Sequence, residues 1–194
     1  AGTGLIGSTL LSQINQQHRF LKEKNNVEIK LIGLTNSRKM LFDINGIKLN
    51  SWKEQIEKSE EIADAESFVQ KCIDSNLPYS VFVDCTATQL IPAHYAKLLD
   101  HSISISTPNK VAISGNYEDY ILLKEKAHKN NVFFHHETTV GAGLPVLSTL
   151  KNLKESGDKI LSIEGVFSGS VSYIFNTFSG KVSFSDTVKN AAKK

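Results

Sequence analysis

Three glycines at the start of the chain, Gly2, Gly4 and Gly7, stand in the spacing G-x-G-x-x-G. This spacing is typical of the loop that joins the first strand to the first helix of a dinucleotide-binding βαβ unit. Gly2 would permit a tight turn, Gly4 would let a phosphate approach the backbone, and Gly7 would let the helix pack closely on a sheet. The pattern alone fits a structural glycine turn equally well, and the strand that should precede such a loop would lie ahead of Ala1.

The segments after this loop alternate between helix and strand patterns. A helix is expected first, because four apolar residues share one helical face: Ile6, Leu10, Leu11 and Ile14. Strands are expected at 27–36, 80–86, 102–107 and 132–137, and a strong amphipathic helix at 117–129. Such alternation over residues 1–131 predicts an α/β fold, a Rossmann-like doubly wound parallel sheet. The remainder, with an expected strand at 159–167, reads as the start of a second region.

Local signals add four details to this outline. Asn45 and Gly46 stand between two alternating runs, which predicts a hairpin turn. Ser51 with Glu54 forms a capping-box pattern, and Asp64 is expected to cap the next helix. Pro145 is well placed for the first turn of a further helix.

Composition excludes several classes of function. The 22 basic and 20 acidic residues give a net charge of only +2, so no nucleic-acid partner is indicated. The two cysteines have no metal-binding or disulfide spacing. No apolar run is long enough to cross a membrane, for which about 18 residues are needed. A reducing, cytoplasmic compartment is the expectation, or a plastid if the source is a plant.

The residues after the second expected strand bear on the choice of cofactor. A site that prefers NAD usually has an acidic residue here, which binds the ribose 2′-hydroxyl. This chain instead has the polar residues Asn36 and Ser37 followed by the basic Arg38 and Lys39. The absence of a carboxylate favours NADP, whose 2′-phosphate would be attracted by the positive charge. The alternative is that these basic residues begin a solvated loop.

Two further strand ends carry candidate residues. Asp84, Cys85 and Thr86 end one strand at the edge of the sheet where ligands bind in such folds. Cys85 could be a thiol nucleophile, but no base lies near it in sequence, and a structural role for a buried cysteine is favoured. Asp84 would act as a cap. Lys110 follows another strand, where it could reach a carbonyl group, unless it is an ordinary surface lysine.

The stretch HHETTVGAGLP, residues 135–145, is the most unusual. His135 and Glu137 fall on the same side of a strand, but a third zinc ligand with sensible spacing is missing. One carboxylate beside a glycine loop better suits a hard cation bound by oxygen atoms. A left-handed turn leading into the helix at Pro145 is the structural alternative.

Three motifs, STPNK, ETTVGAGLPV and GVFSGSVSYIFN, resemble homoserine dehydrogenase in their order and spacing. The resemblance is strongest to the dehydrogenase half of bifunctional aspartokinase/homoserine dehydrogenases, and it extends over essentially all 194 residues, including GLTNS and VDCT. It implies the reversible reduction of L-aspartate 4-semialdehyde to L-homoserine with NAD(P)H, a step toward threonine and methionine. It also implies a homo-oligomer, a dimer or larger.

The same resemblance assigns residues to sites. The cofactor pyrophosphate would bind the loop formed by Gly2, Thr3, Gly4, Leu5, Ile6 and Gly7. Thr86 and Lys110 would contact the cofactor, with Lys110 beside the nicotinamide and the substrate. Ser170 would lie near the bound amino acid. A monovalent cation, sodium in most relatives, would bind Glu137 and the carbonyl oxygens of Val140, Ala142 and Leu144.

On this basis residues 1–133 would form the NAD(P)-binding domain, without its first strand. Residues 134–194 would begin the catalytic and dimerisation domain, and we expect the chain to be part of a longer polypeptide. The principal proton-donating lysine is expected beyond residue 194, which leaves positioning or polarisation to Lys110. Two alternatives stay open: a non-catalytic NADP-binding fragment, and a semialdehyde dehydrogenase that uses Cys85.

Overall fold

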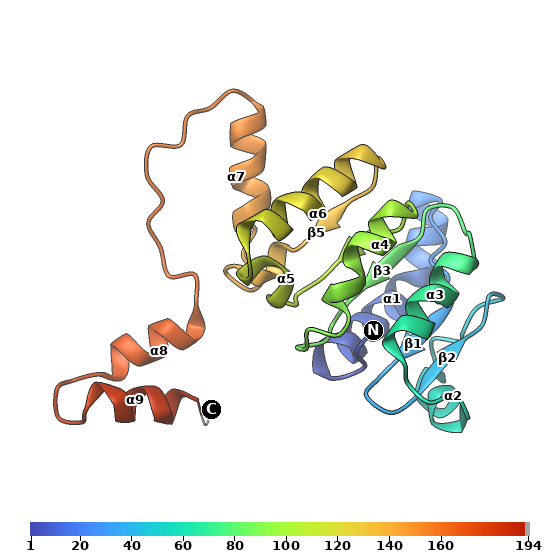
Figure 1. Ribbon diagram of the computed structural model, residues 1–194, viewed down its shortest axis with the longest axis horizontal. Helices are drawn as coiled ribbons and strands as arrows, with labels where there is room; N and C mark the ends of the chain where they lie inside the picture. The colour runs from blue at the N-terminus through green and yellow to red at the C-terminus, as the bar shows by residue number, and fades with distance from the viewer. Residues whose placement is uncertain (193–194) are drawn as a thin grey trace. The chain divides into compact units, whose positions relative to one another are not determined.

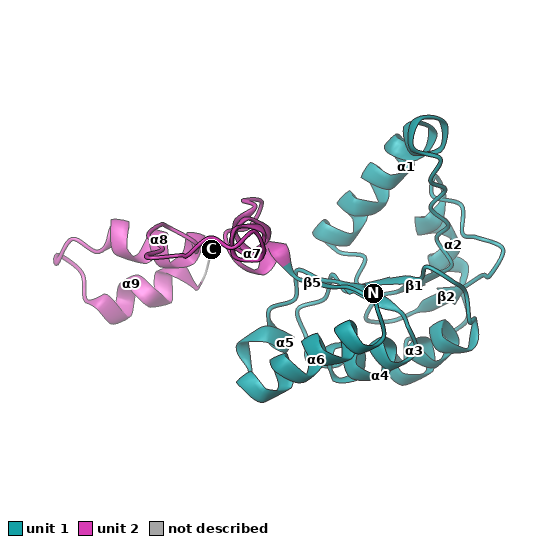
Figure 2. Cartoon of the chain, turned by 90° about the horizontal axis from the view of Figure 1, so that it is seen from above, with its two compact units in different colours: residues 1–136 teal, residues 137–194 magenta. Residues whose placement is uncertain are grey.

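The computed structural model describes residues 1–192 (Figure 1). It divides the chain into two compact units, residues 1–136 and a second unit that begins at Glu137 (Figure 2). Each unit is described by itself. No helix among residues 1–192 is long and apolar enough to cross a membrane.

The first unit alternates helices and strands. Their order is α1 (Leu5–Asn25), β1 (Gly33–Thr35), β2 (Met40–Phe42), α2 (Trp52–Lys58), α3 (Ala65–Asp74), β3 (Val81–Val83), η1 (Pro92–His94), α4 (Tyr95–Asp100), β4 (Ser104–Ser106), α5 (Val111–Ser114), α6 (Tyr117–Lys129) and β5 (Phe134–His135).

The strands form a parallel sheet and an antiparallel pair. β3, β4 and β5 are parallel and adjacent in that order, with Phe82 opposite Ile105 and Ile105 opposite Phe134. β1 pairs with β2 in antiparallel fashion. The parallel sheet with its connecting helices confirms the predicted α/β, Rossmann-type class.

The backbone of Ala1 and Gly2 links these two groups of strands. The Ala1 nitrogen donates to the Val83 carbonyl at 2.6 Å, and Cys85 N donates to the Ala1 carbonyl at 2.8 Å. On the other side, Gly2 N donates to the Thr35 carbonyl at 2.8 Å. The start of the glycine loop therefore lies between the carboxyl ends of β1 and β3. An apolar cavity of about 150 Å³ adjoins this point, lined by residues of α1, of 30–34 and of 80–83.

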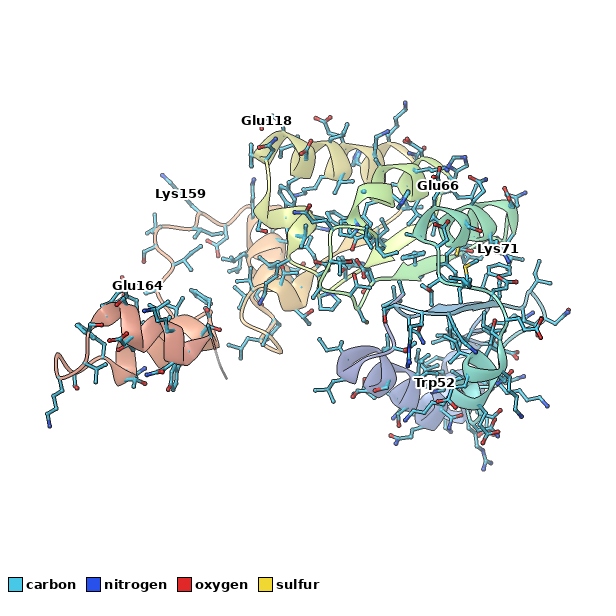
Figure 3. All side chains as sticks on the ribbon, turned by 60° about the horizontal axis from the view of Figure 1, so that its bottom comes forward. Trp52, Glu66, Lys71, Glu118, Lys159 and Glu164 are labelled. Atoms are coloured by element: carbon cyan, nitrogen blue, oxygen red, sulfur yellow. The ribbon has the colours of Figure 1, made fainter. Side chains whose placement is uncertain are left out.

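Helices pack on both sides of the strands, as Figure 2 shows for α1 on one side and α4 and α6 on the other. The larger core includes Phe68 of α3, Phe82 of β3, Leu99 of α4 and Ile105 of β4. The second core joins α1 to α2 through Leu11 and Trp52, which is labelled in Figure 3. Removing each such side chain from water stabilises the fold by about 1.5–3 kcal/mol.

The second unit contains η2 (Glu137–Thr139), α7 (Val146–Glu155), α8 (Gly169–Thr177) and α9 (Phe184–Ala191). Ser168 and Ser183 begin α8 and α9, and each side chain accepts a hydrogen bond from a backbone amide of the first turn. Pro145 occupies the N-cap position of α7. The expected strand at 159–167 is wrong: these residues form no strand. An alternating pattern favours a strand, but pairing with a second one is needed to form it, and the described part of this unit supplies none.

The structure contains a hairpin, but not the one predicted from the sequence. β1 and β2 are joined by Asn36–Lys39, where the Asn36 side-chain oxygen accepts hydrogen bonds from the amides of Arg38 and Lys39, each at 2.8 Å. The prediction at Asn45 and Gly46 is wrong in this respect, because their turn does not join two paired strands. Asn36 favours the observed turn, since an asparagine that bonds the backbone two and three residues later stabilises a turn locally.

The first expected strand is shorter than 27–36, because only residues 33–35 form β1. The helix after Ser51 is present, but the Ser51 side chain accepts no capping bond from the helix backbone. Instead it accepts from the Gln55 carboxamide at 3.2 Å. The Asp64 cap is confirmed, since Asp64 accepts from Ser67 N at 2.7 Å.

Candidate functional site

Two of the three loop glycines are required by close packing. A Cβ atom on Gly7 would lie 2.0 Å from the carbonyl oxygen of Gly2. Gly2 has a φ of +83°, and a Cβ atom there would lie 2.7 Å from the carbonyl carbon of Cys85. Gly4 differs, because a Cβ atom would meet nothing within 4 Å. The space beside Gly4 is therefore open to a ligand.

The loop leads into the N-terminus of α1. Gly4 is the N-cap residue, so no side chain caps the helix, and the first turn contains no acidic residue. Leu5 is 85% exposed and Ile6 is 55% exposed, so this turn lies at the surface. The first amides of a helix have no intrahelical acceptor, and with the helix dipole they favour an anion. Together with Thr3, these residues can accept a pyrophosphate in the way the sequence predicts.

The loop after β1 contains two basic side chains, and one of them is available to a phosphate. The Asn36 carboxamide is used in the turn, and Lys39 Nζ donates to the Glu57 carbonyl at 2.5 Å. Ser37 and Arg38 are exposed, and Arg38 forms no ion pair within residues 1–192. Of the two basic residues in this loop, Arg38 is thus the one available to a phosphate.

Thr86 and Lys110 follow the carboxyl ends of adjacent parallel strands. Thr86 is half-buried, and its hydroxyl oxygen accepts from the Asn109 carboxamide at 3.2 Å. Lys110 is the N-cap residue of α5 and its side chain is exposed. The structure therefore joins the Thr86 loop to the residue directly before Lys110.

A buried polar network underlies this junction and was not predicted from the sequence. Asp84, with no exposed surface, accepts from the Tyr95 hydroxyl at 2.6 Å and from the Asn109 carboxamide at 3.1 Å. Thr107 Oγ1 donates to the Asp84 carbonyl at 2.9 Å. The available signal was the charge of Asp84 at the end of an apolar strand, because a buried carboxylate requires donors. The partners themselves are 11 to 25 positions away.

Cys85 lies beside the glycine loop, but its environment does not activate it. Burial raises the pKa of the Cys85 thiol. Burial raises the pKa of Cys72 from its usual value of 9.0 to about 11. A nucleophilic cysteine needs a lowered pKa, because the thiolate is the reactive form. These thiols are suited to packing.

In the second unit, Glu137 lies at the N-terminus of α7. Its two carboxylate oxygens accept hydrogen bonds from the amides of Leu147 at 2.9 Å and of Ser148 at 2.8 Å. The loop between them turns through left-handed residues, with Ala142 at φ +51°, and the Leu144 carbonyl accepts from Val146 N at 2.9 Å.

Both oxygens of Glu137 are therefore already hydrogen-bonded, and the left-handed turn expected as the structural alternative is present. No cluster of three or more His, Cys, Asp or Glu side chains suited to a metal occurs in the part of the chain that the structure describes. Ser170 is an exposed residue in the first turn of α8.

Comparison with protein families gives two matches along the chain. A family model described as "Homoserine dehydrogenase, NAD binding domain" matches residues 2–137, and one described as "Homoserine dehydrogenase" matches residues 145–194. Among curated proteins, bifunctional aspartokinase/homoserine dehydrogenase 2 of Zea mays, described as chloroplastic, is 46% identical over 98% of this chain and 21% of its own length. Homoserine dehydrogenase of Schizosaccharomyces pombe is 36% identical over 98% of this chain and 52% of its own length.

Solved structures agree with these matches. A hyperthermophilic archaeal homoserine dehydrogenase in complex with NADPH has a TM-score of 0.75 and 25% identity, over 99% of this chain and 59% of that one. A Candida auris protein described as of unknown function has a TM-score of 0.78 and 31% identity, over 98% of this chain and 53% of that one. The chain spans about a fifth of the length of its bifunctional relatives. With the first family model covering residues 2–137, the chain belongs to the homoserine dehydrogenase family.

Proposed function

We propose that the polypeptide containing this chain catalyses the NADP-dependent, reversible reduction of L-aspartate 4-semialdehyde to L-homoserine. The observation that carries the proposal is the glycine loop, which opens at Gly4 onto the uncapped N-terminus of α1 at the carboxyl edge of the strands. Membership of the family supplies the reaction. The archaeal relative solved with NADPH supports the class of cofactor.

The bound cofactor would lie along the carboxyl edge of the strands. Its pyrophosphate would rest on the glycine loop, Gly2 to Gly7, and its 2′-phosphate on Arg38, with Asn36 and Ser37 adjacent. The nicotinamide end would then lie on the opposite side of the glycine loop, toward Thr86 and Lys110. When bound, NADPH supplies the hydride that reduces the aldehyde carbon.

Lys110 and Ser170 are proposed to act on the substrate. The exposed Lys110 ammonium would polarise the aldehyde oxygen or position it, since charge develops on that oxygen as the hydride arrives. Ser170 would bind the amino-acid part of the substrate. The principal proton donor is proposed to be a lysine outside these 194 residues.

We propose a monovalent cation, sodium, at Glu137 and the carbonyls of Val140, Ala142 and Leu144. Carboxylate and carbonyl oxygens are the donors that hard cations prefer, so the chemistry of this set fits. Each carboxylate oxygen already bonded to an α7 amide can still offer a lone pair. The cation would brace this loop and would take no part in the chemical step.

The two family models support different roles for the two parts of the chain. Residues 1–133 are proposed to bind the cofactor, and residues 134–194 to begin the catalytic and dimerisation region of a homo-oligomer. The proposed compartment is the cytoplasm, or the plastid for a plant source, as in the relatives described as chloroplastic.

The proposal is tested by incubating the complete polypeptide with homoserine and NADP⁺ and following NADPH formation by absorbance. Turnover that requires both reactants supports it. Tight NADPH binding without turnover would instead favour the alternative, a non-catalytic nucleotide-binding protein. The same assay on this chain alone tests whether the fragment is active.

A further inference from the structure

We propose that Asn109, anchored on the buried carboxylate of Asp84, is the positioning residue for the nicotinamide half of the cofactor site. It does so by tying the loop that carries Thr86 to the loop that carries Lys110. The inference rests on the proposed function, because it assigns a role within the NADP site.

The Asn109 carboxamide joins the two loops with both of its polar atoms. Its nitrogen lies 3.2 Å from Thr86 Oγ1 and 2.9 Å from the Thr88 carbonyl oxygen, both in the loop after β3. Its oxygen accepts from Val111 N at 3.0 Å, at the start of α5. Lys110 stands between Asn109 and Val111. Hydrogen bonds of the Asn109 side chain therefore hold the backbone on both sides of Lys110.

Asp84 is the anchor of this arrangement. One carboxylate oxygen accepts from Thr86 N at 2.8 Å, and the other accepts from Asn109 Nδ2 and from the Tyr95 hydroxyl. Burial raises the pKa of Tyr95, and so does its hydrogen bond to Asp84, so this hydroxyl stays protonated and donates. A fully buried carboxylate with three donors has little freedom to move, because no water is at hand to replace a hydrogen bond that breaks.

Thr107 completes the connection between the strands. Its hydroxyl donates to the Asp84 carbonyl at 2.9 Å and accepts from Asn109 N at 2.9 Å. Backbone hydrogen bonds join β3 to β4 within the sheet. Beyond the last paired residues, side-chain hydrogen bonds thus continue this connection. Thr107 and Asn109 are each only 3% exposed, so these bonds are protected from water.

The network lies on one side of the glycine loop only. The Gly2 backbone bonds β1 through Thr35, while Ala1 bonds β3 through Val83. Arg38 follows β1, and Thr86 follows β3. A dinucleotide centred on the loop therefore has its 2′-phosphate on the β1 side, and the Asn109 network faces the other half. Substitution of Asn109 should therefore weaken binding of the nicotinamide half of the cofactor and leave binding of the adenosine half unchanged.

The test compares two ligands by calorimetric titration of the complete polypeptide: NADPH, and 2′-phospho-ADP-ribose, which lacks the nicotinamide ring. Asn109→Ala is expected to weaken NADPH binding about tenfold and to leave 2′-phospho-ADP-ribose binding unchanged. Asn109→Ser, which keeps a small polar group, serves if the alanine variant fails to fold. Ile105→Val is the matched control, because it perturbs a buried residue of β4 outside the network. It should lower the melting temperature without changing the ratio of the affinities for the two ligands.

Three results would overturn the proposal. If Asn109→Ala weakens the binding of both ligands equally, Asn109 supports the fold and does not position the nicotinamide half. If the binding of both ligands is unchanged, the two loops keep their positions without the Asn109 side chain. Failure of the unsubstituted protein to bind either ligand would refute the proposed function itself, which distinguishes that failure from the other two.

Discussion

A methyl group on Gly7 would lie 2.0 Å from the carbonyl oxygen of Gly2, closer than any non-bonded carbon and oxygen can approach. The first turn of α1 and the start of the glycine loop are therefore packed backbone against backbone. Gly4, between them, faces open space. These three glycines share one sequence motif but have different physical roles.

Substitution at these positions should separate folding from binding. Gly7→Ala is expected to lower the free energy of unfolding by about 1–3 kcal/mol, because the loop or α1 must move to admit the methyl group. Gly4→Ala should cost at most about 1 kcal/mol, as a poorer N-cap, yet should weaken NADPH binding by obstructing the phosphate. Denaturant titration and NADPH fluorescence measure the two effects. Unchanged NADPH affinity in Gly4→Ala would count against a phosphate at this helix end.

Arg38→Ala should reduce the preference for NADPH over NADH. Its exposed guanidinium is proposed to bind the 2′-phosphate, and one charge-assisted contact is worth about 1.5–3 kcal/mol, or about tenfold or more in affinity. Lys39→Ala is the matched control, since Lys39 Nζ is already bonded to the Glu57 carbonyl. Affinities for both cofactors should be measured by titration. An Arg38→Ala protein that retains its full preference would refute this assignment.

Glu137→Gln should destabilise the start of α7. The carboxylate accepts two amide hydrogen bonds there, and the neutral amide keeps only one acceptor and loses the interaction with the helix dipole. The expected loss is about 1 kcal/mol in the unfolding of the region that contains α7, measured by hydrogen exchange.

The same variant tests the proposed cation. Sodium should raise the melting temperature of the unsubstituted protein more than choline chloride does at equal ionic strength, and Glu137→Gln should remove this difference. A sodium effect that persists in the variant would place the cation elsewhere.

The buried thiol of Cys72 should make stability fall at alkaline pH. Its folded pKa of about 11 lies above its usual value of 9.0, so folding favours the protonated thiol. The contribution is complete below pH 9.0 and is lost as the pH rises toward about 11, by about 2 kcal/mol. Urea titrations across this range should show a smaller decline in Cys72→Val than in the unsubstituted protein. Equal declines would show that Cys72 does not contribute.

The sequence by itself determined the family, the α/β class and the features that depend on neighbouring residues. The glycine spacing and the long motifs identified the family that the family models match. The Asp64 cap and the helix at Tyr117–Lys129 were also predicted correctly. A cap and an amphipathic helix are set by residues within a few positions of each other, and such signals are readable from sequence.

Only the tertiary structure decided which strands pair and what surrounds each buried group. It placed the hairpin turn at Asn36 in place of Asn45, left residues 159–167 without a strand, and connected Asp84 to Asn109 across 25 positions. The roles of Lys110 and the other proposed site residues stay predictions. The physical reason is the same throughout. Strand pairing and the satisfaction of a buried charge depend on partners that only the folded chain brings together, and no local pattern specifies those partners.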